Sequence, residues 1–154
     1  MPTSKEEVLG RLRKQRIAEE IVDSAVVIAE WRESVRSLLE RIRGWLADAV
    51  SEGLFSVVPE TISRQEERLG SYEADALKIV TPKGDAIRIA PRARYAVGAY
   101  GRVDFESPSD KAILVRSGID PDRWCFAILE GPRGWVLKDL DEEEFWNVLS
   151  QLIS

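Results

Sequence analysis

The stretch that decides the fold runs from Ile28 to Ala49 and reads IAEWRESVRSLLERIRGWLADA. Its apolar side chains recur at alternating intervals of three and four residues, at Ile28, Trp31, Val35, Leu38, Ile42, Trp45 and Ala49. This spacing places them on one face of an α-helix. Leu39 and Leu46 widen the same face. The pattern therefore predicts an amphipathic helix with one buried side.

This helix has predictable limits. Ser4 and Glu7 have the spacing of a capping box, and Gly53 suits the left-handed residue that closes a helix. A straight helix between them would be roughly 72 Å long, about twice the diameter of a globule of this size. It either breaks at the N-cap residues Asp23 and Ser24 and folds back as a hairpin, or stays long and pairs with another subunit. We expect the break.

The rest of the chain predicts a short helix, an antiparallel sheet and a C-terminal helix. Pro59 as a first helical residue and Gly70 as a stop predict a helix over Glu60–Leu69. From residue 76 the apolar period shortens to about two residues, which is typical of strands. Strands are predicted at 76–80, 86–90, 94–106, 111–116, 123–130 and 135–140. Asp141 and Glu144 have capping-box spacing and start the C-terminal helix.

The predicted fold class is α+β. It comprises a long N-terminal helix or helical hairpin, an antiparallel sheet of five to six strands, and a C-terminal helix packed on the sheet. We treat residues 1–154 as one domain, with a helical N-terminal region at 1–53 and the short helix, sheet and C-terminal helix at 54–154.

The composition excludes several classes of enzyme. The chain has 154 residues, 22 Lys and Arg against 27 Asp and Glu, a formal charge of -5, no His and one Cys. It cannot build a Ser-His-Asp unit, a Cys-His unit, a zinc site of Cys and His, or an internal disulfide. No apolar run is long enough to cross a bilayer, and the N-terminus is too polar for a signal peptide. We expect a cytoplasmic protein without a cofactor or metal, and the composition weighs against an enzyme.

Arginine and tyrosine concentrate in one stretch, 88–102, which contains no acid. If 94–106 is one strand, alternate side chains of this stretch share a face. Guanidinium groups match phosphate oxygens, and tyrosine offers a ring on which a base can stack. The predicted binding residues are Arg88, Arg92, Arg94, Tyr100 and Arg102. This face suits nucleic acid or an acidic protein, and the structural alternative is packing beneath a helix of the same chain.

Two acidic features and the single cysteine have simpler explanations than catalysis. Asp104 and Glu106 are spaced to project side by side and share Mg²⁺, but the following strand lacks the acid-x-Lys that restriction-type nucleases add. The acids of Asp141–Glu144 complement a helix start. Cys125 lies inside an apolar run and is most simply a core residue.

The sequence best fits a non-enzymatic protein-interaction module of the inhibitor, immunity, chaperone or adaptor type. It would bind a protein partner through its sheet face or its helical arm, and we expect no binding to a membrane. The predicted interface residues, which could also form a homodimer through the N-terminal helix, are Ile28, Trp31, Val35, Leu38, Ile42 and Trp45. The alternative is a nucleic-acid-associated protein that uses the Arg/Tyr-rich strand, and a Mg²⁺-dependent nuclease is the weakest hypothesis.

Overall fold

A computed structural model describes residues 4–153, apart from the side chains of residues 18–22. The fold is α+β, with helix α1 (Ser4–Ser51), a sheet, and helix α2 (Glu142–Ile153). The strands are β1 (Ser56–Glu66), β2 (Gly70–Val80), β3 (Ala86–Ala93), β4 (Arg102–Glu106), β5 (Lys111–Gly118), β6 (Arg123–Leu129) and β7 (Trp135–Asp139). A single 3-10 turn, Gly131–Arg133, joins β6 to β7.

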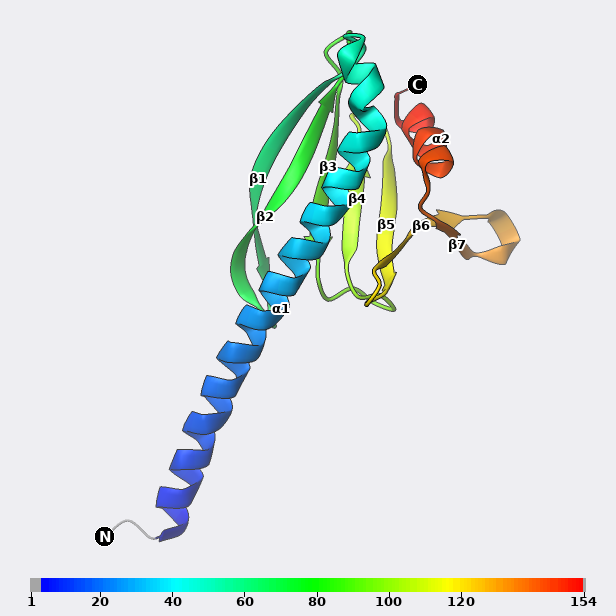
Figure 1. Ribbon diagram of the computed structural model, residues 1–154. Helices are drawn as coiled ribbons and strands as arrows, with labels where there is room; N and C mark the ends of the chain where they lie inside the picture. The colour runs from blue at the N-terminus through cyan, green and yellow to red at the C-terminus, as the bar shows by residue number, and fades with distance from the viewer. Residues whose placement is uncertain (1–3, 154) are drawn as a thin grey trace.

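The sheet is a simple meander, in which each strand pairs antiparallel with the next from β1 to β7 (Figure 1). It has seven strands instead of the five to six that the sequence predicted, because the segment expected to be a helix forms β1. Most of the predicted hairpins form. The backbone N–H of Thr81, for example, donates to the carbonyl of Asp85 at 2.9 Å across the turn between β2 and β3.

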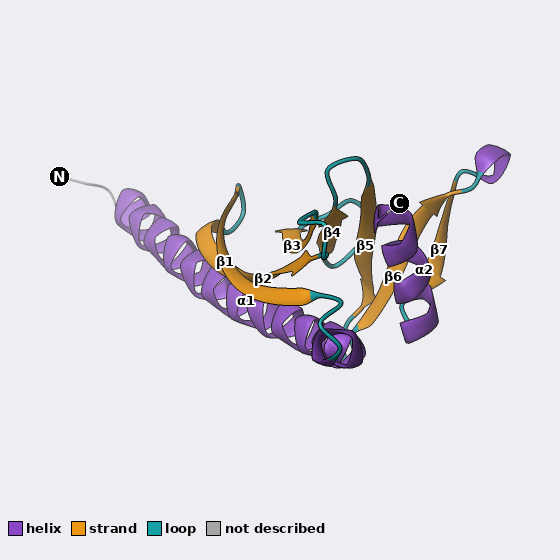
Figure 2. Ribbon diagram, turned by 90° about the horizontal axis from the view of Figure 1, so that it is seen from above, coloured by secondary structure: helices purple, strands orange, loops and turns teal. Residues whose placement is uncertain are grey.

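The two helices pack on the same face of the sheet. Helix α1 crosses the strands diagonally, and Figure 2 shows it running along the sheet. The rings of Trp45 in α1 and Phe145 in α2 lie 5.3 Å apart, and Phe145 also meets Phe105 of β4 at 6.3 Å. One hydrophobic core therefore joins α1, α2 and the inward face of the sheet. Within residues 4–153, no helix covers the opposite face (Figure 2).

Helix α1 continues unbroken through Asp23 and Ser24, so the predicted break is wrong. The apolar face that seemed too long for one chain is covered from Trp31 onward by the sheet, and the earlier part extends past the sheet (Figure 1). The Ser24 hydroxyl donates to the carbonyl of Arg68, 3.2 Å away in the β1–β2 turn. This contact suits a helix interior better than a cap.

The apolar seam of α1 is buried by the chain itself. Trp31, Val35 and Ile42 have no exposed surface, and Leu38 is 2% exposed. Ile28 and Trp45 are half-buried against the same core. Packing on a sheet, which two bulky Trp side chains favour, therefore accounts for the seam. These residues have little surface left to offer to a partner.

The predicted helix over Glu60–Leu69 is wrong, because this segment forms most of strand β1 and the turn after it. Every residue of β1 has a partner on β2, from Ser56 opposite Val80 to Glu66 opposite Gly70. Pro59 is tolerated because β1 is an edge strand, where one side of the backbone needs no hydrogen-bond donor. Pairing with β2 makes this segment a strand, even though Pro59 is typical of the first turn of a helix.

The predicted strand over Arg94–Glu106 is also wrong in its first half. Only Arg102–Glu106 forms a strand, and the residues before it make a loop closed by a bridge between Ala96 and Ala99. Gly98 (φ 74°) and Gly101 (φ 148°) adopt backbone conformations that lie outside a strand. The alternating face predicted from this segment is therefore not formed.

The C-terminal helix agrees with its prediction. The Asp141 carboxylate accepts a hydrogen bond of 2.7 Å from the backbone N–H of Glu144, as a capping residue should. Its apolar side chains are buried in the core at Phe145, Val148, Leu149 and Leu152.

Candidate functional site

The predicted binding arginines are dispersed, and two of them are paired with acids. Arg88 lies on β3, on the helix-free face, with its Nε 3.0 Å from Oε1 of Glu60. Arg102 begins β4, and its Nε lies 2.7 Å from Oδ1 of Asp104. Arg92 is exposed near the end of β3. Neutralised guanidinium groups on separate strands provide little of the continuous positive surface that a phosphate backbone requires.

Arg94 and Tyr100 do come together, inside the loop between β3 and β4. The guanidinium carbon of Arg94 lies 5.9 Å from the ring centre of Tyr100 and 5.2 Å from that of Tyr95. The backbone N–H groups of Arg94 and Tyr95 donate to the Glu66 carboxylate at 3.0–3.1 Å. The Tyr72 hydroxyl donates to the same carboxylate. The carboxylate at the end of β1 therefore holds this loop in place.

The carboxylates of Asp104 and Glu106 form ion pairs with basic side chains of the protein itself. Asp104 is buried, and its second oxygen lies 3.1 Å from Nζ of Lys111, which also approaches Glu106 at 3.6 Å. Within residues 4–153, no group of three or more metal-ligating side chains converges. The arrangement resembles a cross-strand ion-pair ladder.

Cys125 is buried at 2% exposure, as predicted.

A buried guanidinium that the sequence did not reveal lies between α1 and the sheet. Arg116 has no exposed surface, and its two terminal nitrogens donate to the Glu30 carboxylate at 2.6 and 2.8 Å. Its Nε and Nη2 also donate to the carbonyl of Tyr100, at 3.1 and 2.9 Å. The guanidinium lies 5.0 Å from the ring centre of Trp31. These contacts connect α1 to β5 and to the β3–β4 loop.

The same network extends to the β5–β6 loop. Asp122 approaches Arg116 with one oxygen at 3.4 Å, and the Ser34 hydroxyl of α1 donates to its other oxygen. Strand alternation could have revealed Arg116, because Leu114 and Arg116 of β5 have the same parity and both point to the core. Since its donors are directed at protein acceptors, the network is suited to holding the fold together.

The pKa of Glu30 predicts how the fold responds to acid. The hydrogen bonds from Arg116 lower it below the ordinary value of 4.5, against the opposing effect of burial. The stabilisation from this carboxylate is complete above the unfolded-state pKa and is lost as the pH falls through the lower folded-state pKa. We therefore expect the difference in unfolding free energy between wild type and Glu30→Gln to shrink from pH 7 to pH 3. Urea titrations at both pH values measure this difference, and a constant difference would contradict it.

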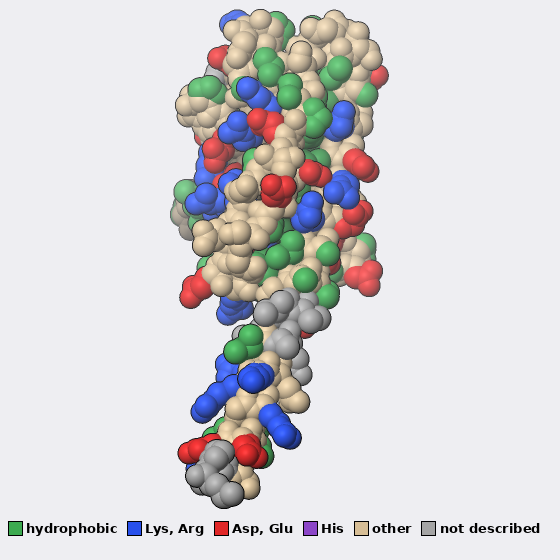
Figure 3. Space-filling model, turned by 90° about the vertical axis from the view of Figure 1, so that its left-hand side faces the viewer, with side chains coloured by type: hydrophobic (Ala, Val, Ile, Leu, Met, Phe, Trp, Pro, Cys, Tyr) green, Lys and Arg blue, Asp and Glu red, His purple; other side chains and the backbone are tan. Residues whose placement is uncertain are grey.

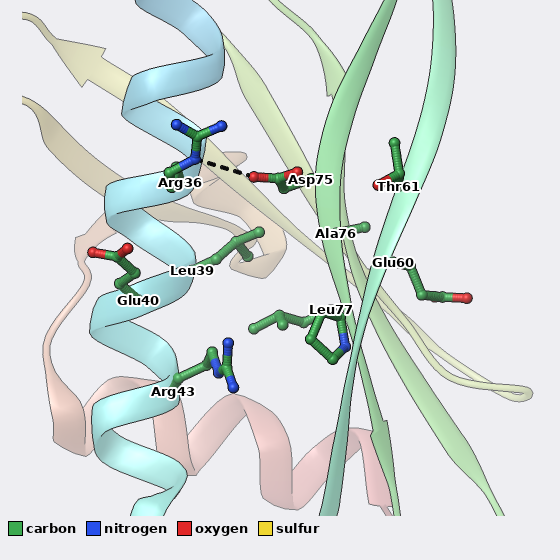
Figure 4. Close-up of a pocket in the computed structure, with 10 residues that line it drawn as sticks. Arg36, Leu39, Glu40, Arg43, Glu60, Thr61, Asp75, Ala76 and Leu77 are labelled. Carbon is green, nitrogen blue, oxygen red and sulfur yellow. Dashed lines mark hydrogen bonds and ion pairs between the residues drawn. The ribbon is translucent and has the colours of Figure 1, made fainter.

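An open groove of about 300 Å³ lies between α1 and strands β1 and β2 (Figure 4). Leu39 and Leu77 are part of its lining. Arg36 reaches across it from the helix, with its Nε 3.3 Å from Oδ2 of Asp75. Arg43 extends toward the strands from the next turns of α1. Charges of both signs line the groove, so it favours no single class of ligand.

The helix-free face of the sheet carries an apolar patch at its β7 end. Leu129 and Trp135 are a cross-strand pair, and Leu137 lies two residues further along β7 on the same face. Their exposed fractions are 62%, 63% and 55%.

The most isolated surface is the first half of α1. We call residues 4–22 the arm, which extends past the sheet in Figure 1. Its described part exposes large apolar side chains, with Val8 and Leu12 each at 54% and Ile17 at 57%. Basic side chains also gather here (Figure 3), and the sequence between residues 11 and 16 holds Arg11, Arg13, Lys14 and Arg16 with no acid. No helix within the described residues is long and apolar enough to cross a membrane.

Comparison with models of known protein families, with curated proteins and with solved structures finds no match.

Proposed function

We propose that this chain is a non-enzymatic protein-interaction module of the adaptor type, and that the arm of α1 is its binding element. The observation that carries the proposal is the exposure of Val8, Leu12 and Ile17 on a helical segment that extends past its own fold.

Helix energetics support a partner for the arm. A helical segment that packs against nothing is only weakly stabilised in water, because most of the stability of helices in proteins comes from tertiary packing. Burying a Val, Leu or Ile side chain contributes roughly 1.5–3 kcal/mol. A protein surface that covers the arm would therefore stabilise both the helix and the complex, as in recognition of an amphipathic helix.

The other candidate functions have weaker support. Nucleic-acid binding through Arg88, Arg92, Arg94, Tyr100 and Arg102 would have to break the ion pairs of Arg88 and Arg102. A nuclease centred on Asp104 and Glu106 would have to displace Lys111. The arm requires no rearrangement before it binds.

Site-specific photo-crosslinking in the cells that produce the protein tests this function. A benzophenone amino acid at position 12 should form a covalent adduct with protein, since this side chain would lie in the interface. The control position is Val97, which is fully exposed in the β3–β4 loop. The proposal fails if position 12 gives no protein adduct, or if position 97 gives the same adducts as position 12.

A further inference from the structure

A second apolar stripe runs along α1 on the side away from the sheet. The residues Val8, Leu12, Gln15, Val26 and Ala29 are exposed. The residues that continue the same spacing, at positions 19 and 22 of the sequence, are Glu and Val. The intervals are four and three residues throughout, which is the spacing of a coiled-coil seam. Val26 precedes the core-facing Ile28 by two residues, or about 200° around the helix, so the two stripes point in nearly opposite directions.

The stripe is self-complementary about Ile17. Two copies of α1 that run antiparallel, with their position 17 at the same level, place Val8 against the partner's Val26, and apolar position 12 against apolar position 22. Position 15 is then level with position 19, and the sequence has Gln and Glu there, so polar positions also pair with polar positions. A twofold dimer requires such a match of a surface with itself. We infer that the arm binds a second copy of this chain as an antiparallel helix pair, an inference that rests on the proposed function.

Charge favours the antiparallel orientation. Residues 11–16 contain four bases and no acid, whereas residues 18–23 contain three acids and no base. Antiparallel pairing about Ile17 places each basic segment beside the partner's acidic segment. Parallel pairing would place the two basic segments side by side, where like charges repel.

The antiparallel pairing of the two arms also leaves room for the sheet of each copy. The overlap runs from Ser4 of one copy to Glu30 of the other, about 40 Å of helix, which is close to four heptads. The sheet covers the opposite side of α1, where Trp31 and Val35 are buried. The two sheets therefore lie at opposite ends of the helix pair and outside its interface.

Light scattering after size-exclusion chromatography tests the association with purified full-length protein. Wild type should have twice the mass of the 17.4 kDa chain. Leu12→Asp and Val26→Asp should each raise the dissociation constant at least about tenfold, because each places two charges in the dimer interface. The control is Val97→Asp, which places the same charge at a fully exposed apolar position outside α1 and should remain a dimer. Circular dichroism checks that each variant is folded.

Disulfide trapping tests the orientation. Val8→Cys mixed with Val26→Cys should form a covalent heterodimer under mild oxidation, whereas Val8→Cys alone should not, because its two copies would lie about 27 Å apart. Cys125 is buried and does not compete. A covalent dimer of Val8→Cys alone would overturn the antiparallel pairing. A monomeric wild type would overturn self-association, and a position-12 adduct with a different protein would then leave the proposed function standing.

Discussion

Gly101→Ala is expected to lower the free energy of unfolding by about 3–5 kcal/mol. A Cβ atom at this position would lie 2.2 and 2.4 Å from two ring carbons of Trp31, well inside van der Waals contact. Trp31 is completely buried between α1 and the sheet, so its ring cannot move aside without disturbing the core. Overpacking of this kind costs about 1–3 kcal/mol or more, and the φ of +148° adds backbone strain of similar size.

Gly98→Ala is the control for backbone strain. Gly98 lies in the same loop with φ +74°, but no atom lies within 4 Å of the Cβ that alanine would add. It should cost only about 1–2 kcal/mol, the price of a left-handed alanine. Urea titration of the three proteins gives both values. Equal losses for the two variants would show that contact with Trp31 does not matter.

Glu30→Ala is expected to cost about 3 kcal/mol, because it leaves the guanidinium of Arg116 in the core without its bidentate partner. Arg116 is completely buried, and the remaining carboxylate, Asp122, approaches it only at 3.4 Å. A double-mutant cycle with Arg116→Met isolates the interaction. The double variant should be more stable than the sum of the single losses predicts, by roughly 1–3 kcal/mol.

Glu33→Ala provides the matched comparison on the same helix. Glu33 pairs with Arg36 at 3.5 Å, but both side chains are largely exposed, so this pair should contribute less than about 0.5 kcal/mol. If Glu30→Ala costs no more than Glu33→Ala in urea titrations, the Glu30–Arg116 pair does not hold α1 to the sheet.

The parts of the fold that depend on local signals could be predicted from the sequence. The seam from Trp31 to Trp45 follows from helical spacing, and the Asp141 cap follows from a three-residue interval. Strand β1 could not be predicted, because Pro59 and Gly70 resemble helix limits and only pairing with β2 decides otherwise. The loop before Arg102 could not be predicted for a related reason, because the positive φ angles of Gly98 and Gly101 belong to the folded loop and do not follow from the spacing of apolar residues.

The candidate site was predicted only in part. A helical arm was among the expected binding elements, but the sequence could not show which half of α1 would find the sheet. Strand alternation places Arg116 on the core face, but its pairing with Glu30 could not be predicted, because the two residues are 86 positions apart. The predicted arginines, by contrast, could be found from composition, but the pairing of Arg88 with Glu60 depends on strand register.

The long-range contacts between α1 and β5 also determine when, during synthesis, the packing of α1 is completed. Glu30 leaves the ribosome 86 residues before Arg116, roughly 4–17 s earlier at ordinary rates of translation. Until the nascent chain reaches β5, the face that carries Trp31 lacks the guanidinium of Arg116 and the strand that carries it. The first segment to be made is therefore among the last to be buried. A nascent chain that stalls within the sheet displays both apolar stripes of α1 at once.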